Sequence, residues 1–201
     1  PRDFARREIA MGRRAIVSTP DLWRMYPEAE WIPNCVPIDD ESYLPLPHRN
    51  GHNGGMTVVG HSPSRRDLKN TQEFLDVASE IPGLKPRLIE NVPNKVCLQL
   101  KKPCDLFFDH MQGYYGVSSL EALSQGIPTI AGLDDWNTRC LRDFAGGDEL
   151  PWIIARGRDE LRAVLERGKD EERGVQSRWF MENYWTEERI AGKLVSLYES
   201  L

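Results

Sequence analysis

Residues 105–132 of the chain read DLFFDHMQGYYGVSSLEALSQGIPTIAG. The segment opens with the apolar run of DLFFD and closes with that of PTIAG, and residues 117–125 between them have a helical pattern. Short apolar runs bounded by turn residues are typical of buried strands. Strand, helix and strand in this order indicate a βαβ unit, whose two strands run parallel in one sheet.

The same alternation extends to both sides of this segment. Two strand–helix pairs precede it: MTVVGH (56–61) with a helix over 68–80, and PRLIE (86–90) with a helix over 93–102. A helix over 135–144 and a strand at PWIIA (151–155) follow it, then helices over 158–168, 170–182 and 186–200. The pattern predicts an α/β fold from about residue 55 onward. We expect a Rossmann-like, doubly wound parallel sheet of about five strands with helices on both faces.

The first 55 residues do not follow this regular alternation of strands and helices. We expect a helix over 3–11, a strand at 15–17, a second helix over 20–26 and a strand over 29–33. From residue 34 to residue 55, three prolines and the motif RNGHNGG replace any sustained periodicity, which favours a linker wrapped over a surface. The chain begins with Pro rather than Met, so we expect it to be a piece of a longer protein.

Composition excludes several classes of protein. The 201 residues are 40% hydrophobic and 28% charged, which is ordinary for a globular domain and argues against disorder and coiled coil. The net charge of −5 predicts no nucleic-acid partner, because such binding is driven by cations that displace phosphate counterions. No apolar stretch approaches the roughly 20 residues of a membrane span, and no apolar signal sequence opens the chain.

The cysteines predict neither a metal site nor a disulfide framework. Four are present, without CxxC spacing and without a histidine at metal-ligand spacing beside them: Cys35, Cys97, Cys104 and Cys140. We therefore expect reduced thiols and a cytoplasmic protein.

Ligands of open parallel sheets bind at the carboxyl ends of the strands, so the loops there are the first place to look for function. After the first strand of the sheet come Arg66 and Lys69, on either side of a helix start for which Asp67 is a good N-cap. Two cations beside free N–H groups favour a phosphate or diphosphate site, although a solvated basic turn is the plainer alternative. His61 fits either a ligand contact or a hydrogen-bonded structural histidine.

The next two loops add candidate contacts. Asn91 and Val92 end a strand before Pro93 and could present a flat surface to a base. In the following loop, Gly113 and Gly116 permit close backbone approach, so the N–H groups of residues 117–119 could bind a pyrophosphate at a helix start. Glu121 lies one turn further and could accept hydrogen bonds from two sugar hydroxyls, or simply complement the helix dipole. Tyr114 and Tyr115 fit either this loop's ligand or internal packing.

Two other features of these loops matter for function. Asp134 and Asp135 follow the next strand and are best explained as a helix cap, with Asn137 close behind. The chain has no G-x-S-x-G motif, no cysteine–histidine pair in a catalytic pattern and no P-loop. We therefore expect neither a serine or cysteine nucleophile nor a metal ion.

In this order, the motifs resemble the C-terminal half of a GT-B glycosyltransferase of the large retaining family called glycosyl transferases group 1. The resemblance covers nearly the whole chain and rests on WIPNCVPID (31–39), HSPSRRDLKNT (61–71), GYYGVSSLEALSQGIPTIAG (113–132) and RWFMENYWTEERIAGKLVSLYESL (178–201). Three departures stand out. Gly113 occupies the place of the first of two glutamates that many members carry, and Asn70 and Cys35 stand where glycine is usual.

The resemblance implies a role for each matched residue. Arg66 and Lys69 would hold the diphosphate of a nucleotide-sugar donor, Glu121 would bind its ribose, and the Asn91–Val92 loop would lie against its base. Backbone groups of residues 116–118 would contact the phosphates or the donor sugar. We thus predict catalytic roles for Glu121, Lys69 and Arg66. The predicted donor-binding set is His61, Arg66, Lys69, Asn91, Val92, Gly113, Tyr114, Tyr115, Gly116, Val117, Ser118 and Glu121.

The resemblance also implies a domain plan and a reaction. Residues 1–33 would be the end of an N-terminal domain, 34–55 the interdomain linker, 56–185 the nucleotide-sugar-binding domain and 186–201 a returning helix. The expected function is retaining transfer of a hexose-type sugar to a glycan, lipid or protein acceptor, without cofactor or metal and inactive without the N-terminal domain. The alternatives are a sugar-nucleotide epimerase-like protein and a non-catalytic nucleotide-binding or structural domain.

A membrane partner is a further expectation. Residues 1–14 carry five arginines against Asp3 and Glu8, a net charge of +3. Such a basic face could meet an anionic leaflet, which would place the protein peripherally at the inner membrane face. A helix face packed on the N-terminal domain explains the same charges.

Overall fold

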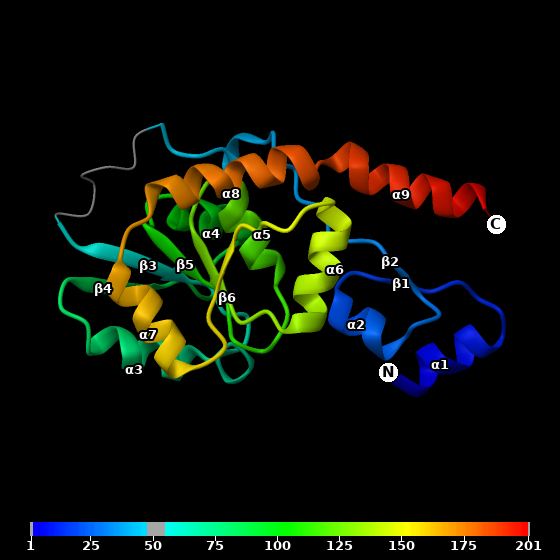
Figure 1. Cartoon of the computed structure of the whole chain (residues 1–201), viewed down its shortest axis with the longest axis horizontal. Coiled ribbons are helices and arrows are strands. Elements are labelled where there is room, and N and C mark those ends of the chain that lie inside the picture. Colours follow the sequence, from blue (N-terminus) through cyan, green and yellow to red (C-terminus); the bar gives the residue numbers. More distant parts are fainter. Residues whose placement is uncertain (1, 48–54, 201) are drawn as a thin grey trace.

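The structure is a computed structural model that describes residues 2–47 and 55–200. The centre of this described part is a parallel sheet of five strands in the order β4-β3-β5-β6-β7. Figure 1 labels four of them, β3 to β6. The strands are β3 (Thr57–His61), β4 (Leu84–Leu88), β5 (Leu106–Phe108), β6 (Thr129–Ala131) and β7 (Trp152–Ile154). The chain moves outward from β3 to β4 and then crosses back to β5, so the switch in strand order lies between β3 and β5. The expected doubly wound α/β fold is confirmed.

Helices cover both faces of this sheet. α3 (Thr71–Ser79) and α7 (Arg158–Arg167) lie together on one face. The other face carries α4 (Asn94–Lys101), α5 (Val117–Ser124) and α8 (Glu171–Tyr184), with α6 (Asp135–Ala145) at one end of the sheet. Strand residues alternate between the faces: Leu106 and Phe108 join the core under α3 and α7, whereas Phe107 packs with Ala122 of α5.

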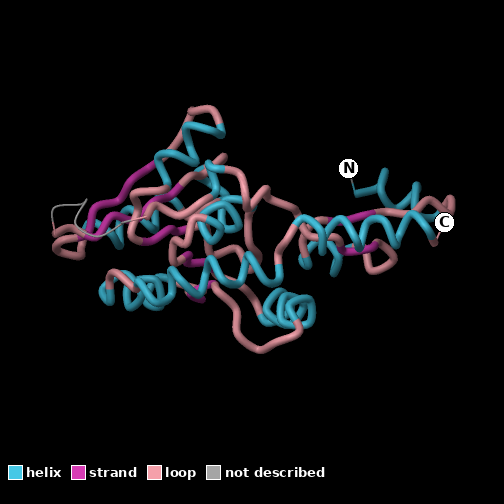
Figure 2. Tube along the Cα trace, turned by 90° about the horizontal axis from the view of Figure 1, so that it is seen from above, coloured by secondary structure: helices cyan, strands magenta, loops and turns pink. Residues whose placement is uncertain are grey.

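The N-terminal residues form a separate small unit. Two helices and two strands build it: α1 (Arg2–Ala10), β1 (Ile16–Val17), α2 (Pro20–Met25) and β2 (Glu30–Trp31). Within the described residues, β1 and β2 pair only with each other, in parallel. The Trp136 indole of α6 donates a hydrogen bond of 2.8 Å to the carbonyl of Pro20, which fixes α2 to the main unit. α9 (Glu187–Glu199) extends beside β1 and β2, so residues 2–33 and α9 together project as an arm (Figures 1 and 2).

The described part of the linker wraps over the surface of the main unit, with one short 3-10 helix, η1 (Glu41–Tyr43). Its start is fixed to the end of α8, because the Trp185 indole donates to the Asn34 carbonyl at 2.9 Å. Arg178 likewise donates to the Ile38 carbonyl at 2.9 Å. Most of the predicted RNGHNGG motif lies outside the described residues, and the division of the chain into domains stays a prediction.

One helix begins later than expected. The predicted helix over 68–80 starts only at Thr71, after a 3-10 turn at Arg66–Leu68 (η2). Asp67 is therefore not its N-cap and instead pairs with Arg65. Asn70 occupies the N-cap position with a left-handed φ of 51°. Asparagine tolerates this conformation better than most residues, which explains how Asn70 can stand where glycine is usual in related turns.

Candidate functional site

The loops that follow β3, β4 and β5 meet at the carboxyl edge of the sheet, around the switch in strand order. Lys69 from the first loop reaches across this switch to Asp109, the residue after β5, with 2.8 Å between Nζ and Oδ1. The Asp109 side chain is 1% exposed and that of Lys69 is 15% exposed. Lys69 is thus a partly accessible cation at the place where ligands of such sheets bind.

The Asp109 carboxylate organises the glycine-rich loop. Its Oδ2 accepts hydrogen bonds of 2.6 Å from the Gly116 N–H and the Ser119 hydroxyl. Burial by itself would raise the pKa of Asp109, but the nearby charges of Lys69 and His110 and the hydrogen bonds from Lys69 and Ser119 bring that pKa to about 2. A Cβ atom at Gly116 would stand 2.7 Å from Lys69 Nζ, so only glycine allows this close approach. The N–H that Gly116 was expected to offer a ligand is instead bound to this internal anion.

The start of α5 remains open to an external anion. Within the described residues, the N–H groups of Val117 and Ser118 have no hydrogen-bond acceptor. Val117 is exposed, and the Ser118 hydroxyl is hydrogen-bonded to that of Ser62 at 2.9 Å. Unpaired N–H groups at a helix N-terminus favour negative charge, so these two groups and Lys69 can bind a phosphate together.

Arg66 lies at the rim of this edge. Its guanidinium donates through Nε to Glu90 at 2.7 Å and through a second nitrogen to the other carboxylate oxygen. Hydrogen bonds from Arg66 lower the pKa of Glu90. Arg66 itself is exposed, as are Asn91, with a φ of 54°, and Val92 beside it. The Arg66–Glu90 pair therefore brings the loops after β3 and β4 together next to the segment predicted to meet a base.

Glu121 is buried and held from two sides. Lys101 donates to its Oε2, and Asn94 donates to Oε1 at 2.9 Å. Both partners belong to α4, and sequence reasoning missed both. The Glu121 carboxylate lies one turn inside α5, below the open N–H groups.

Two residues of the predicted donor-binding set point elsewhere. The His61 side chain is buried, with Nδ1 donating to the Phe108 carbonyl at 2.9 Å and Nε2 accepting from the Thr71 hydroxyl at 2.8 Å. Burial lowers the pKa of His61 to about 4, so the ring is neutral at pH 7. Tyr115 is buried in the core against Trp152 and Trp185. His61 is thus placed as a hydrogen-bonded internal histidine and Tyr115 as a packed core residue.

Gly113 and Tyr114 lie on the β6 side of the loop. Gly113 has a φ of 91°, and its carbonyl accepts a hydrogen bond of 2.8 Å from the Asp134 N–H. The half-buried ring of Tyr114 packs against His110, with 4.5 Å between centroids. Asp134 caps α6 through the Asn137 N–H at 2.7 Å, as expected for one of the two aspartates.

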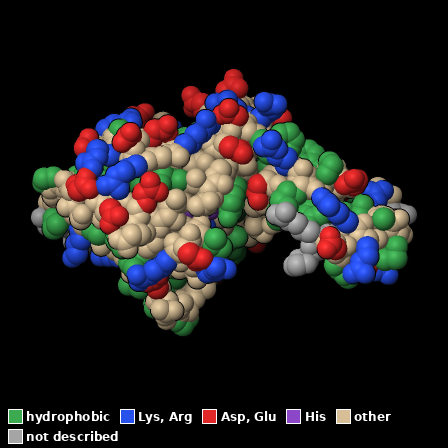
Figure 3. All heavy atoms as spheres, turned by 90° about the horizontal axis from the view of Figure 1, so that it is seen from below, with side chains coloured by type: hydrophobic (Ala, Val, Ile, Leu, Met, Phe, Trp, Pro, Cys, Tyr) green, Lys and Arg blue, Asp and Glu red, His purple; other side chains and the backbone are tan. Residues whose placement is uncertain are grey.

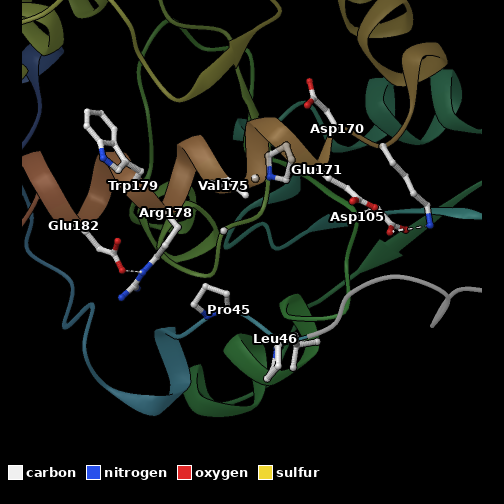
Figure 4. Close-up of a pocket in the computed structure, with 14 residues that line it drawn as sticks. Pro45, Leu46, Asp105, Asp170, Glu171, Val175, Arg178, Trp179 and Glu182 are labelled. Carbon is white, nitrogen blue, oxygen red and sulfur yellow. Dashed lines mark hydrogen bonds and ion pairs between the residues drawn. The ribbon is translucent and has the colours of Figure 1, made fainter.

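A second hollow lies far from these loops. A groove of about 500 Å³ opens at the amino edge of the sheet, between α8 and the linker (Figure 4). Val175 and Trp179 are exposed along it, and Lys169 pairs with Asp105 at 3.1 Å. No group of three metal-ligating side chains occurs in the part of the chain that the structure describes. Among the described helices, none has the length and apolarity to cross a bilayer.

Comparison with known proteins bears out the fold. No protein-family model and no curated protein matches the chain. Among solved structures, Anabaena HepE in complex with UDP and glucose is similar at 13% identity and a TM-score of 0.71, over 92% of this chain and 63% of that one. S. aureus TarM, in a complex that includes UDP, is similar at 16% identity and 0.65, over 91% and 43%. A glycosyltransferase from Rickettsia africae is similar at 10% identity and 0.70, over 100% and 67%.

These similarities show a shared fold. HepE and TarM are GT-B glycosyltransferases, so the chain has a GT-B glycosyltransferase-like fold, as its motifs predicted. The chain spans 43% of the length of TarM and 63% of that of HepE.

Proposed function

We propose that the chain is the donor-binding part of a glycosyltransferase that uses a nucleoside-diphosphate sugar. One observation carries the proposal: the partly accessible Lys69 side chain brings its ammonium beside Gly116 at the open N-terminus of α5, at the switch in strand order. This is where a diphosphate would find a cation and two N–H donors together. The UDP complexes of HepE and TarM support a nucleotide as the ligand.

The charges of the site would rearrange when a donor binds. Arg66, Lys69 and Lys101 are paired with Glu90, Asp109 and Glu121 respectively, so the three pairs are neutral overall. A diphosphate adds negative charge that needs a cation. Exposed ion pairs contribute little to stability, so Arg66 can turn from Glu90 to a phosphate at small cost. Lys69 can share its ammonium, which has three donors, between Asp109 and a phosphate.

The remaining roles follow the same geometry. We propose that Glu121 accepts the ribose hydroxyls and that Asn91 and Val92 lie against the base. As the bond between the sugar and the diphosphate breaks, its electron pair passes to the leaving nucleoside diphosphate. Lys69, Arg66 and the α5 N-terminus would stabilise this charge without requiring a metal ion. Retention of anomeric configuration, a hexose-type sugar and a glycan, lipid or protein acceptor complete the proposal.

The acceptor site would need a further domain. The chain spans 43% of TarM, and within the described residues β1 and β2 form a sheet of only two strands. Phe4, Met11 and Ile16 are exposed on this unit, and Figure 3 shows hydrophobic and basic side chains side by side on the arm. We propose that this surface packs on an N-terminal domain and that transfer requires that domain.

A membrane surface is the alternative binding partner for this exposed face of the arm. Exposed Phe4 and Met11 next to Arg7 and Arg14 would suit an anionic leaflet of the inner membrane in a cytoplasmic protein. Co-sedimentation with anionic liposomes tests this. Equal binding by the chain and by a variant with Arg6, Arg7, Arg13 and Arg14 replaced by Gln would reject the electrostatic contact.

Calorimetric titration with UDP, GDP, ADP and their sugar conjugates tests the donor site. We expect one nucleoside diphosphate to bind and Lys69→Ala to weaken it strongly. Failure of all three to bind, both to this chain and to the chain joined to its N-terminal half, would reject the proposal and favour a structural domain. Conversion of a bound nucleotide sugar to its epimer would favour the epimerase alternative.

A further inference from the structure

Lys101 is a buried cation in the last turn of α4. Its side chain is fully buried, and the Glu121 side chain that it contacts is 8% exposed. Taking both charges out of water is costly, and two apolar side chains of similar volume would often stabilise such a position equally well. A buried ion pair here therefore calls for a role beyond stability.

The ammonium lies beneath the first turn of α5. It donates to Glu121, to the Ser118 hydroxyl at 3.3 Å and to the Ser118 carbonyl at 3.5 Å. The ring of Phe107 covers another side of the ammonium, with 4.7 Å between Nζ and the ring centroid. Lys101 thus links the Glu121 carboxylate to Ser118, whose N–H is one of the two open donors.

The second partner of Glu121 comes from the same helix. Asn94 and Lys101 are seven residues apart, close to two turns, and so face the same side of α4. Asn94 donates to Oε1 and is exposed, whereas Lys101 donates to Oε2 from the interior. A carboxylate can accept about four hydrogen bonds, two on each oxygen. Asn94 and Lys101 therefore leave each oxygen of Glu121 free to accept one more.

We infer that Lys101 and Asn94 are positioning residues that fix the Glu121 carboxylate so that it accepts both hydroxyls of a donor ribose. The inference rests on the proposed function. The two hydroxyls of a cis diol present two donors side by side, which matches one open acceptor position on each oxygen. The contact of Lys101 with Ser118 places this ribose site next to the N–H groups proposed to bind the phosphates.

Titration with two nucleotides and pyrophosphate separates positioning from folding. Three probes are used. The first is whichever of UDP, GDP and ADP binds most tightly, the second is the 2′,3′-dideoxy analogue of that nucleotide, and the third is inorganic pyrophosphate. The wild-type chain should bind the ribonucleotide about 10- to 100-fold more tightly than the dideoxy analogue, as expected for hydrogen bonds to a charged acceptor. Lys101→Met should abolish this preference while pyrophosphate affinity changes less than about three-fold.

Two further variants keep the test valid if Lys101→Met fails to fold. Asn94→Ala alters an exposed side chain and should reduce the preference partially in a folded protein. Lys101→Met combined with Glu121→Gln removes both buried charges and should fold, yet bind the ribonucleotide no better than its dideoxy analogue. Lys102→Met is the matched control, because this lysine donates to the Glu41 carbonyl instead, and it should keep the wild-type preference.

The outcomes distinguish this inference from the proposed function. If the wild type prefers the ribonucleotide and both Lys101→Met and Asn94→Ala keep that preference, the positioning role is wrong while the donor site stands. If none of the three nucleoside diphosphates binds, either to the wild-type chain or to the chain joined to its N-terminal half, the proposed function fails and the inference fails with it.

Discussion

The Lys69 ammonium and the Asp109 carboxylate lie 2.8 Å apart, on loops that follow two adjacent strands of the sheet. Because the chain visits β4 between these strands, 40 residues separate the two partners in sequence. The Asp109 carboxylate serves as an internal acceptor for the glycine-rich loop, and part of the Lys69 side chain stays accessible. We therefore expect the structure of the loop and the proposed donor binding to depend on the same two side chains.

Removing the Asp109 carboxylate should destabilise the glycine-rich loop and the fold. Asp109→Ala leaves the partly buried Lys69 and the Gly116 N–H without their acceptor, which we expect to cost about 3 kcal/mol. Urea unfolding measures the loss. Ser119→Ala, which removes one donor and no charge, should cost about 1 kcal/mol. An equal loss in both variants would contradict the central role of the charge.

Lys69 should matter more than Arg66 for donor binding. We expect Lys69→Ala to weaken nucleoside-diphosphate binding about ten-fold or more and Arg66→Ala about three-fold, because Arg66 is more exposed. Calorimetry provides both values. Lys85→Ala, at an exposed position on β4, is the matched control and should bind like the wild type. Equal binding by all three variants would place the diphosphate elsewhere.

Two glycines of one loop should respond differently to alanine. Gly116→Ala places a Cβ 2.7 Å from Lys69 Nζ and 3.1 Å from Asp109 Oδ1, so it should disturb the ion pair and reduce nucleotide affinity. Gly113→Ala is strained by its φ of 91°, but the nearest atoms to the new Cβ would be those of Asp134, at 3.6 Å or more. It should cost about 1–2 kcal/mol of stability and leave affinity nearly unchanged. Comparing Kd with the unfolding free energy in both variants checks this contrast.

Stability should fall in mild acid because of His61. The unfolded state takes up a proton near the ordinary pKa of 6.5, whereas the buried ring resists protonation until about pH 4. The unfolded state therefore binds more protons between these values, and stability is lost as pH falls from 6.5 to 4. The difference of 6.5 − 4 = 2.5 corresponds to roughly 3 kcal/mol.

Urea midpoints at pH 7, 5.5 and 4.5 measure this loss. The folded-state pKa of Asp109 is about 2, against an ordinary value of 3.8, so its own contribution is lost only in stronger acid. His61→Gln should show a smaller decline over the range from pH 7 to pH 4.5. An unchanged midpoint in the wild-type protein would contradict the role of burial.

The sequence predicted the architecture well because local patterns determine it. Each sheet strand lies within the apolar run that indicated it or within two residues of it, as at PTIAG and Thr129–Ala131. The start of α3 was wrong because the 3-10 turn at Arg66–Leu68 and the left-handed Asn70 leave no clear signal in composition.

The site was only half predictable. Arg66, Lys69 and Glu121 were placed at the correct edge, but their partners Glu90, Asp109 and Lys101 were not assigned. Those pairings depend on which strands are neighbours, and the order β4-β3-β5 is not a local property.

Two signals could have revealed more. Asp109 directly follows a fully buried strand and precedes a glycine loop, where an acidic residue is well placed to bind loop N–H groups. Lys101 lies three residues after Leu98, on the buried side of α4, which is unusual for a lysine.

The hydrogen bond from Trp185 to the Asn34 carbonyl has a mechanical consequence. The chain passes between the arm and the sheet twice, near residue 34 and near residue 185, and this bond of 2.9 Å holds the two passages together. The arm is held a second time where the Trp136 indole of α6 donates to the Pro20 carbonyl of α2. Because these two hydrogen bonds lie at different places on the arm, we expect the arm to keep its orientation to the sheet unless one of them breaks.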